Sequence, residues 1–177
     1  MSGELVDVRD ILAAVTPGGG KSLLPVIVAA RLIAAGTVER VIWVVPRDSL
    51  QLQAEEAFAD PGWRESPGHR LNVRAAENEA DPFRGLAGYI TTYQGIAAAP
   101  ELQLAEIRCF RTLLVVDEVH HLPGLADYEP GTEVDPTTPD EASSWSRALL
   151  PMLECPITST CSTATCATRG APGRGPG

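Results

Sequence analysis

A glycine-rich stretch between an apolar run and a helix-forming run constrains the fold of this chain more than any other feature. Residues 11–15 are apolar, as in a buried strand, and residues 23–35 have the composition of a helix. Glycines let the backbone curl so that its N–H groups point at phosphate oxygens, and the start of a helix adds positive partial charge. We therefore predict a phosphate-binding loop. Its residues are Thr16, Pro17, Gly18, Gly19, Gly20, Lys21 and Ser22.

Two acidic residues further along supply the second half of a nucleotide site. Residues 112–116 are continuously apolar apart from the first, as in a strand covered on both faces, and Asp117 and Glu118 follow directly. A carboxylate there can bind Mg²⁺ through water, and its neighbour can polarise an attacking water. Each half alone also fits a simpler interpretation. The glycine loop has Val15 where the general pattern starts with glycine, so it also fits an ordinary strand-to-helix loop, and the acids also fit a plain strand end. Their occurrence together favours one magnesium–triphosphate site.

Strand-like and helix-like segments alternate along most of the chain. Strands are expected at 41–45, 70–76 and 86–92, and helices at 50–58, 94–98, 101–108 and 142–154. This alternation predicts an α/β fold with a mainly parallel sheet and helices on both of its faces. Ligands of such sheets bind at the carboxyl ends of the strands, where the glycine loop and the acidic pair both lie.

Four stretches, in order, resemble motifs of the first RecA-like domain of superfamily 2 helicases of the DEAD/DEAH-box type. Residues 16–22 resemble motif I, 45–50 motif Ia, 90–94 a later strand-contacting motif, and 116–120 motif II. The chain is also similar to the translocase part of type III restriction enzymes. The resemblance implies a P-loop NTPase that uses ATP and Mg²⁺. It further implies an ATP hydrolase that couples hydrolysis to translocation or unwinding of nucleic acid in the full-length parent.

The resemblance also implies a role for each matching residue. Residues 16–22, Lys21 included, bind the phosphates, while Ser22 and Asp117 bind Mg²⁺. Lys21, Glu118 and His120 are the catalytic residues, with Glu118 as general base and His120 as the link to the nucleic-acid side. The nucleic-acid contacts are assigned to Arg47, Thr91 and Thr92, with DNA expected in preference to RNA. The adjacent His121 is assigned a structural role.

The C-terminal part departs from the family pattern. Residues 1–154 are expected to form the ATP-binding domain, and residues 155–177 a low-complexity, disordered tail with at most an edge strand at 156–160. Residues 162–165 imitate a further family motif within that tail. The second RecA-like domain is expected to be absent, as though the parent were truncated at both ends, so weak ATPase activity and no unwinding are predicted for this chain alone.

Composition narrows the remaining possibilities. The formal net charge of −9 gives no overall basic footprint for nucleic acid. The four cysteines form no C-x-x-C pair, which disfavours a zinc site, and the absence of a signal peptide or membrane span predicts a cytoplasmic protein. Three alternatives remain open: a non-enzymatic nucleotide-binding fragment or decayed gene product, a type III restriction enzyme translocase subunit, and another P-loop enzyme such as a kinase or GTPase.

Overall fold

The computed structural model describes residues 10–15, 20–76, 82–83, 85–118, 141–155 and 158–165. Within these residues six strands form one sheet in the order β1-β6-β5-β2-β4-β3, and every neighbouring pair is parallel. The predicted parallel α/β fold is therefore confirmed. The strands are β1 (Asp10–Val15), β2 (Arg40–Val45), β3 (Val73–Ala75), β4 (Gly88–Thr92), β5 (Thr112–Val116) and β6 (Thr158–Thr165).

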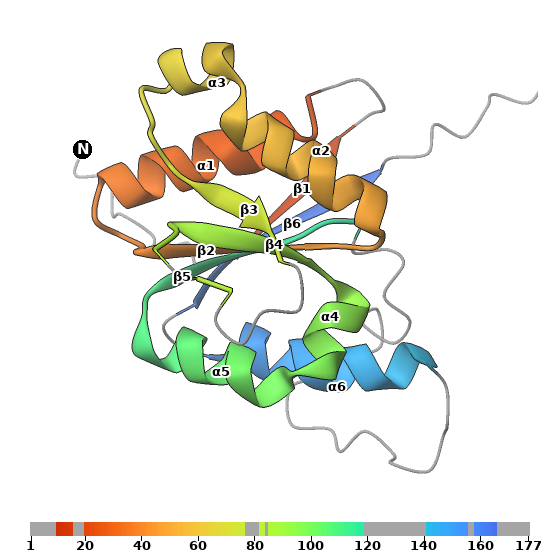
Figure 1. Cartoon of the computed structure of the whole chain (residues 1–177). Helices are drawn as coiled ribbons and strands as arrows, with labels where there is room; N and C mark the ends of the chain where they lie inside the picture. Colours follow the sequence, from red (N-terminus) through yellow and green to blue (C-terminus); the bar gives the residue numbers. More distant parts are fainter. Residues whose placement is uncertain are drawn as a thin grey trace, which may run out of the picture.

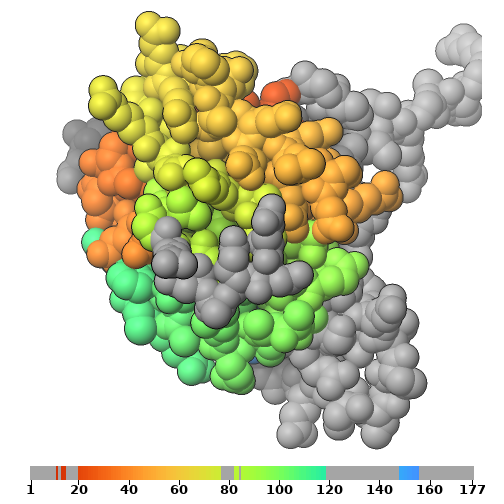
Figure 2. All heavy atoms as spheres, viewed as in Figure 1, coloured from red at the N-terminus to blue at the C-terminus, as the bar shows by residue number. Residues whose placement is uncertain are grey.

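Helices cover both faces of the sheet. Figure 1 shows α1, α2 and α3 on one face and α4, α5 and α6 on the other. The space-filling view shows the same division, with orange and yellow atoms of the first group above and green atoms of α4 and α5 below (Figure 2). The helices are α1 (Leu23–Ala34), α2 (Asp48–Ala59), α3 (Pro61–Glu65), α4 (Tyr93–Ala98), α5 (Pro100–Cys109) and α6 (Glu141–Glu154).

The central strands divide their side chains between two apolar clusters. Because successive side chains of a strand point to opposite faces, Trp43 packs with α1 and α2, whereas Val44 packs with α4, α5 and α6. The same alternation holds in β5, where Val115 and Val116 belong to different clusters. Burial on both faces explains why these two strands were recognisable as continuous apolar runs.

The structure corrects the expectation for the C-terminal part. Residues 158–165 were expected to be a short edge strand followed by disorder, yet they form β6, an internal strand that pairs with β1 on one side and β5 on the other. The expected domain limit at 154 is therefore too early, because the sheet extends to Thr165. An internal strand has both rows of backbone groups paired, so a sequence of small and hydroxyl-bearing residues can occupy it without a long apolar run. Residues 166–177 lie outside the described part of the chain.

Candidate functional site

The phosphate loop joins β1 to α1 at the carboxyl edge of the sheet. β1 ends at Val15 and α1 begins at Leu23. Gly20 has a φ of +80°, a left-handed conformation that favours glycine, and its carbonyl accepts the backbone N–H of Leu23 at 2.9 Å. Predicted residues Thr16, Pro17, Gly18 and Gly19 lie outside the described residues. What the structure shows of the loop is therefore its glycine turn into the helix.

The acidic pair is held by the backbone at the end of β5. The N–H of Asp117 donates to the carbonyl of Val44 at 2.8 Å, so the pairing with β2 continues up to the carboxylate. The next residue, Glu118, has a φ of +53°, and its N–H donates to Oδ1 of Asp117 at 2.9 Å. A non-glycine residue rarely adopts this conformation. The turn holds two consecutive carboxylates at the same edge of the sheet.

Lys21 brings the two halves of the site together. Its Nζ lies 2.8 Å from Oδ1 of Asp117 and also donates a hydrogen bond to Oε1 of Glu118, a residue 97 positions away in the chain. All three side chains are mostly buried, with 20%, 12% and 19% of their surface exposed respectively. The predicted meeting of the loop lysine with the acidic pair is therefore present in the structure.

The electrostatic balance keeps the lysine protonated. Burial by itself would lower the pKa of Lys21, but hydrogen bonds and charge attraction from Asp117 and Glu118 outweigh it, and the pKa is raised above its ordinary value. The sequence contains no other lysine. The only lysine of an acidic chain thus contacts two carboxylates at the carboxyl ends of the strands.

The donor groups fit a magnesium nucleotide. Ser22 precedes the first residue of α1, its side chain is exposed, and it makes no capping hydrogen bond. A hydroxyl and the Asp117 carboxylate are hard oxygen ligands, which Mg²⁺ prefers, with water and phosphate oxygens as its other ligands. Within the described residues there is no group of three histidine, cysteine or acidic side chains that could form a complete protein cage for a metal ion.

Sequence reasoning missed Tyr93, whose hydroxyl holds the backbone of the acidic pair. Its hydroxyl donates to the backbone carbonyl of Asp117 at 2.6 Å, and only 5% of the residue is exposed. Burial, followed by the nearby charges of Asp117 and Glu118, raises the pKa of Tyr93, so its hydroxyl stays protonated and can donate. An aromatic residue after a strand carries no signal of such a bond, because the partner is a backbone atom of another strand.

Sequence reasoning also misjudged the backbone of residues 163–165. In the register of β6, Ser162 lies opposite Val116 of β5, and Thr165 lies opposite Val15 of β1. The last three residues of β6 therefore extend past the end of β5 at the edge that carries the acidic pair. These residues, interpreted as part of a low-complexity tail, belong to the backbone frame of the site.

The three predicted nucleic-acid residues lie at the same edge in different environments. Arg47 is exposed just before α2, whereas Thr91 and Thr92 are 4% and 7% exposed at the end of β4. The Thr92 hydroxyl accepts the N–H of Gly95 at 3.1 Å and so caps α4. Of the three, Arg47 has the freest side chain. The predicted coupling residue His120 lies outside the described residues, as does His121.

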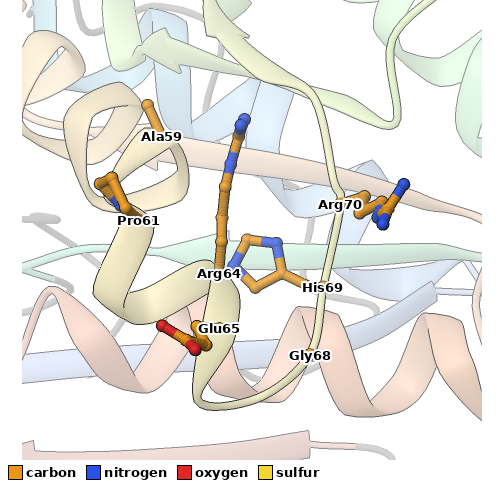
Figure 3. A pocket seen from close by; sticks show the side chains of 7 residues that line it. All are labelled: Ala59, Pro61, Arg64, Glu65, Gly68, His69 and Arg70. Atoms are coloured by element: carbon orange, nitrogen blue, oxygen red, sulfur yellow. The ribbon is translucent and has the colours of Figure 1, made fainter.

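A cavity lies near the amino ends of the strands, on the other side of the molecule from Lys21 and the acidic pair. It measures about 640 Å³ and is lined by residues of α2, α3 and the following turn, among them Arg64, His69 and Arg70 (Figure 3). Since α2 begins after the carboxyl end of β2 and these residues lie between its last turn and the start of β3, the cavity is at the amino edge. The Arg70 side chain points away from Arg64 and His69, so the three side chains do not converge on a common ligand.

The fold and the convergence of Lys21 on an acidic pair define a class, the RecA-like ATP-binding domain of helicases. The family described as "Type III restriction enzyme, res subunit" matches residues 6–147, and the chain belongs to this family. The structural likeness agrees: the UvsW helicase of bacteriophage T4 superimposes with a TM-score of 0.58 over 90% of this chain and 48% of that one. A second structure of T4 UvsW gives 0.57 over 90% and 27%. Both are 16% identical to this chain, so the likeness concerns the fold.

Curated relatives come from mycobacteria. The chain is 34% identical over 113 residues to the uncharacterized protein Rv2917 of Mycobacterium tuberculosis (strain ATCC 25618 / H37Rv) and to the uncharacterized protein ML1624 of Mycobacterium leprae (strain TN). The matched part is 64% of this chain and 18% of each relative, so the chain spans less than a fifth of their length. No helix in the described residues is both long and apolar enough to cross a membrane.

Proposed function

We propose that this chain binds magnesium–ATP between residues 16–22 and the Asp117–Glu118 pair and hydrolyses it, as the first motor domain of a nucleic-acid translocase or helicase. The observation that carries the proposal is the contact of Lys21 with both carboxylates, which lie 96 and 97 positions away in the chain. Residues from two distant parts of the chain meet there, which supports the assignment of both parts to one triphosphate site.

Each residue of the site has a distinct part in this reaction. Lys21 exchanges its carboxylate partners for the β- and γ-phosphates and stabilises the charge that develops during transfer. Ser22 and Asp117 would hold Mg²⁺, which would supply further positive charge at the phosphate oxygens. Glu118 accepts the proton of the water that attacks the γ-phosphate in line. The hydrogen bond from Tyr93 fixes the Asp117 backbone while these exchanges take place.

The proposed partner is a single strand of nucleic acid, DNA in preference to RNA, that crosses the carboxyl edge near Arg47 and residues 91–92. The exposed guanidinium of Arg47 is suited to a phosphate contact, which positions a strand without reading its sequence. The two threonines, whose side chains are buried, contribute by shaping this edge. His120 is proposed to couple the nucleotide to the strand.

A second RecA-like domain of the whole protein is proposed to complete the ATPase. Arginines inserted across a nucleotide cleft accelerate comparable reactions by a factor on the order of 10³ to 10⁵. This chain alone is therefore expected to bind ATP and to turn it over slowly. Whether the whole protein unwinds a duplex or translocates as part of a restriction enzyme, the nucleotide chemistry is the same.

Two variants test the proposal. Lys21→Ala is expected to abolish the rise in melting temperature that Mg-ATP gives to the wild-type chain. Glu118→Gln is expected to retain that rise and to lose the slow ATPase, because the amide cannot accept the proton. The matched control is Glu39→Gln, which removes an exposed carboxylate whose partners among the described residues are the guanidinium and the backbone N–H of Arg111. If no nucleotide stabilises the wild-type chain, the protein is a non-enzymatic fragment and the proposal is wrong.

A further inference from the structure

The peptide between Asp117 and Glu118 is held at both of its polar atoms. Its carbonyl accepts the hydroxyl of Tyr93 at 2.6 Å, and its N–H donates to Oδ1 of Asp117 at 2.9 Å. Rotating this peptide changes the φ of Glu118, which is +53°. A non-glycine residue in this conformation is strained and persists only where its surroundings hold it. The two hydrogen bonds are therefore suited to keeping Glu118 in its turn.

Asp117 has a separate anchor in the sheet. Its own N–H donates to the carbonyl of Val44 at 2.8 Å and continues the pairing of β5 with β2. This bond lies on the N-terminal side of the Asp117 Cα, so it does not depend on the orientation of the peptide that follows. Loss of the bond from Tyr93 should therefore move Glu118 more than Asp117.

Tyr93 presents its hydroxyl from a rigid position. It is the first residue of α4, which follows β4 without a loop. The Thr92 hydroxyl caps α4 by accepting the N–H of Gly95 at 3.1 Å, and a Cβ added at Gly95 would lie only 2.4 Å from Oγ1 of Thr91. The first turn of α4 thus sits tightly on the end of β4. Tyr93 also belongs to the buried apolar cluster that contains Val116, so packing fixes its ring.

The contacts of Glu118 have to change when a nucleotide binds. In the free chain Lys21 donates a hydrogen bond to Oε1 of Glu118, and in the proposed reaction this lysine moves to the phosphates. Glu118 loses that contact at the stage when it has to accept a proton from water. The orientation of the peptide that precedes Glu118 then has a larger influence on where its carboxylate lies.

We propose that Tyr93 is a positioning residue for Glu118, whose hydroxyl keeps this proposed general base in the turn from which it accepts the proton of the attacking water. The inference rests on the ATPase function proposed above. Because Asp117 stays anchored to β2, Tyr93 acts on the hydrolytic step and not on nucleotide binding. A misplaced base lowers the rate of the chemical step and leaves the binding of the substrate unchanged.

The test is Tyr93→Phe in the full chain, which keeps the ring and removes only the hydroxyl. With the chain in excess over ATP, the rate of a single turnover is expected to fall about tenfold or more, because small displacements of a catalytic group are costly. The Kd for Mg-ATP should stay within about twofold of the wild-type value. Tyr89→Phe is the matched control, since it removes a buried hydroxyl that has no partner among the described residues, and it should change neither quantity.

Lys21 gives a second measurement that does not require hydrolysis. If Glu118 leaves its turn, its hydrogen bond with Lys21 weakens and the carboxylate shields the amine less. An amine-reactive reagent, applied without nucleotide, should then modify Lys21 several-fold faster in Tyr93→Phe than in the wild type or in Tyr89→Phe. Mass spectrometry of the peptide that contains Lys21 gives these rates.

The possible results separate this inference from the proposed function. Unchanged turnover and unchanged modification of Lys21 in Tyr93→Phe would overturn the inference and leave the ATPase proposal standing. A turnover rate and an Mg-ATP affinity that fall together would also overturn it, since Tyr93 would then support the whole site and not the base. If the wild-type chain neither binds nor hydrolyses Mg-ATP, the proposed function is wrong, and the modification of Lys21 alone decides whether Tyr93 holds Glu118.

Discussion

At the scale of single residues, Lys21 has two roles. It neutralises two carboxylates in the free chain, and it is proposed to bind the phosphates once a nucleotide is present. A divalent cation without nucleotide must compete with this buried amine for Asp117. The lysine also offers a direct probe of its own site, because it is the only one in the sequence and is partly accessible.

We predict that Mg-ATP protects Lys21 from an amine-reactive reagent. In the free chain 20% of the Lys21 side-chain surface is exposed, and a bound triphosphate would cover the amine. Mass spectrometry of the peptide that contains Lys21 gives the modification rate, with the N-terminal amine as the internal reference. Mg²⁺ alone is expected to give little protection. Equal rates at Lys21 with and without Mg-ATP would contradict the placement of the nucleotide.

A second prediction at this scale concerns His69 at the amino edge. Its Nδ1 accepts the N–H of Leu71 at 3.3 Å, its buried Nε2 has no partner among the described residues, and its ring packs against Phe58. Burial, followed by the charge of Arg64, lowers the pKa of His69. The unfolded chain takes up a proton below about pH 6.5 while the folded one resists it, so stability should fall as pH drops through this range.

Urea unfolding at pH 7.5 and 5.5 measures this loss. His69→Gln should show a smaller loss between the two pH values than the wild type, because the residue that resists protonation has been removed. His120 and His121 remain in both proteins, so the difference between the two isolates His69. An equal loss in both would show that His69 titrates normally in the folded chain.

At the scale of elements, the hydrogen bond from Tyr93 joins the start of α4 to the end of β5. Tyr93→Phe removes the hydroxyl and leaves the Asp117 carbonyl without this donor, so a loss of about 1–3 kcal/mol in unfolding free energy is expected. Tyr89→Phe is the matched control. Its hydroxyl is also buried but has no partner among the described residues, so its removal should be neutral or slightly stabilising. Denaturant unfolding of both variants checks the contrast, and equal losses would refute it.

The two kinds of strand explain how far the sequence could predict these elements. The apolar runs of β2 and β5 were recognisable because both faces are buried, and the acids after β5 marked the site. β6 was expected only as a short edge strand, because its pairing comes from its position between two other strands, and its threonines, serines and alanines carry no apolar pattern. The Tyr93 contact was missed for a related reason, since it depends on the packing of α4 beneath β5 and not on any spacing in the chain.

At the scale of the whole molecule, the strand order makes the sheet depend on its last strand. β1, which leads into the phosphate loop, pairs within the described residues only with β6, and β6 in turn joins it to β5 and the acidic pair. The two halves of the proposed nucleotide site therefore adjoin strands that are separated in the sheet by β6, a segment that the sequence analysis placed in the tail. Removing that segment would remove the backbone hydrogen bonds that, within the described residues, join β1 to the rest of the sheet.

We predict that a chain ending at Glu154 loses the nucleotide site, whereas one ending at Thr165 keeps it. Without β6, the eight residues that pair with β1 and β5 are gone, so Lys21 is no longer held against Asp117. The shorter chain is expected to melt at a lower temperature and to show no stabilisation by Mg-ATP, and the longer one to match the full chain in both. The longer chain is the matched control because it keeps β6 and lacks only residues 166–177, which lie outside the described part of the chain. If the chain ending at Glu154 were stabilised by Mg-ATP as strongly as the full chain, β6 would be dispensable and the nucleotide site would rest on β1, α1 and β5 alone.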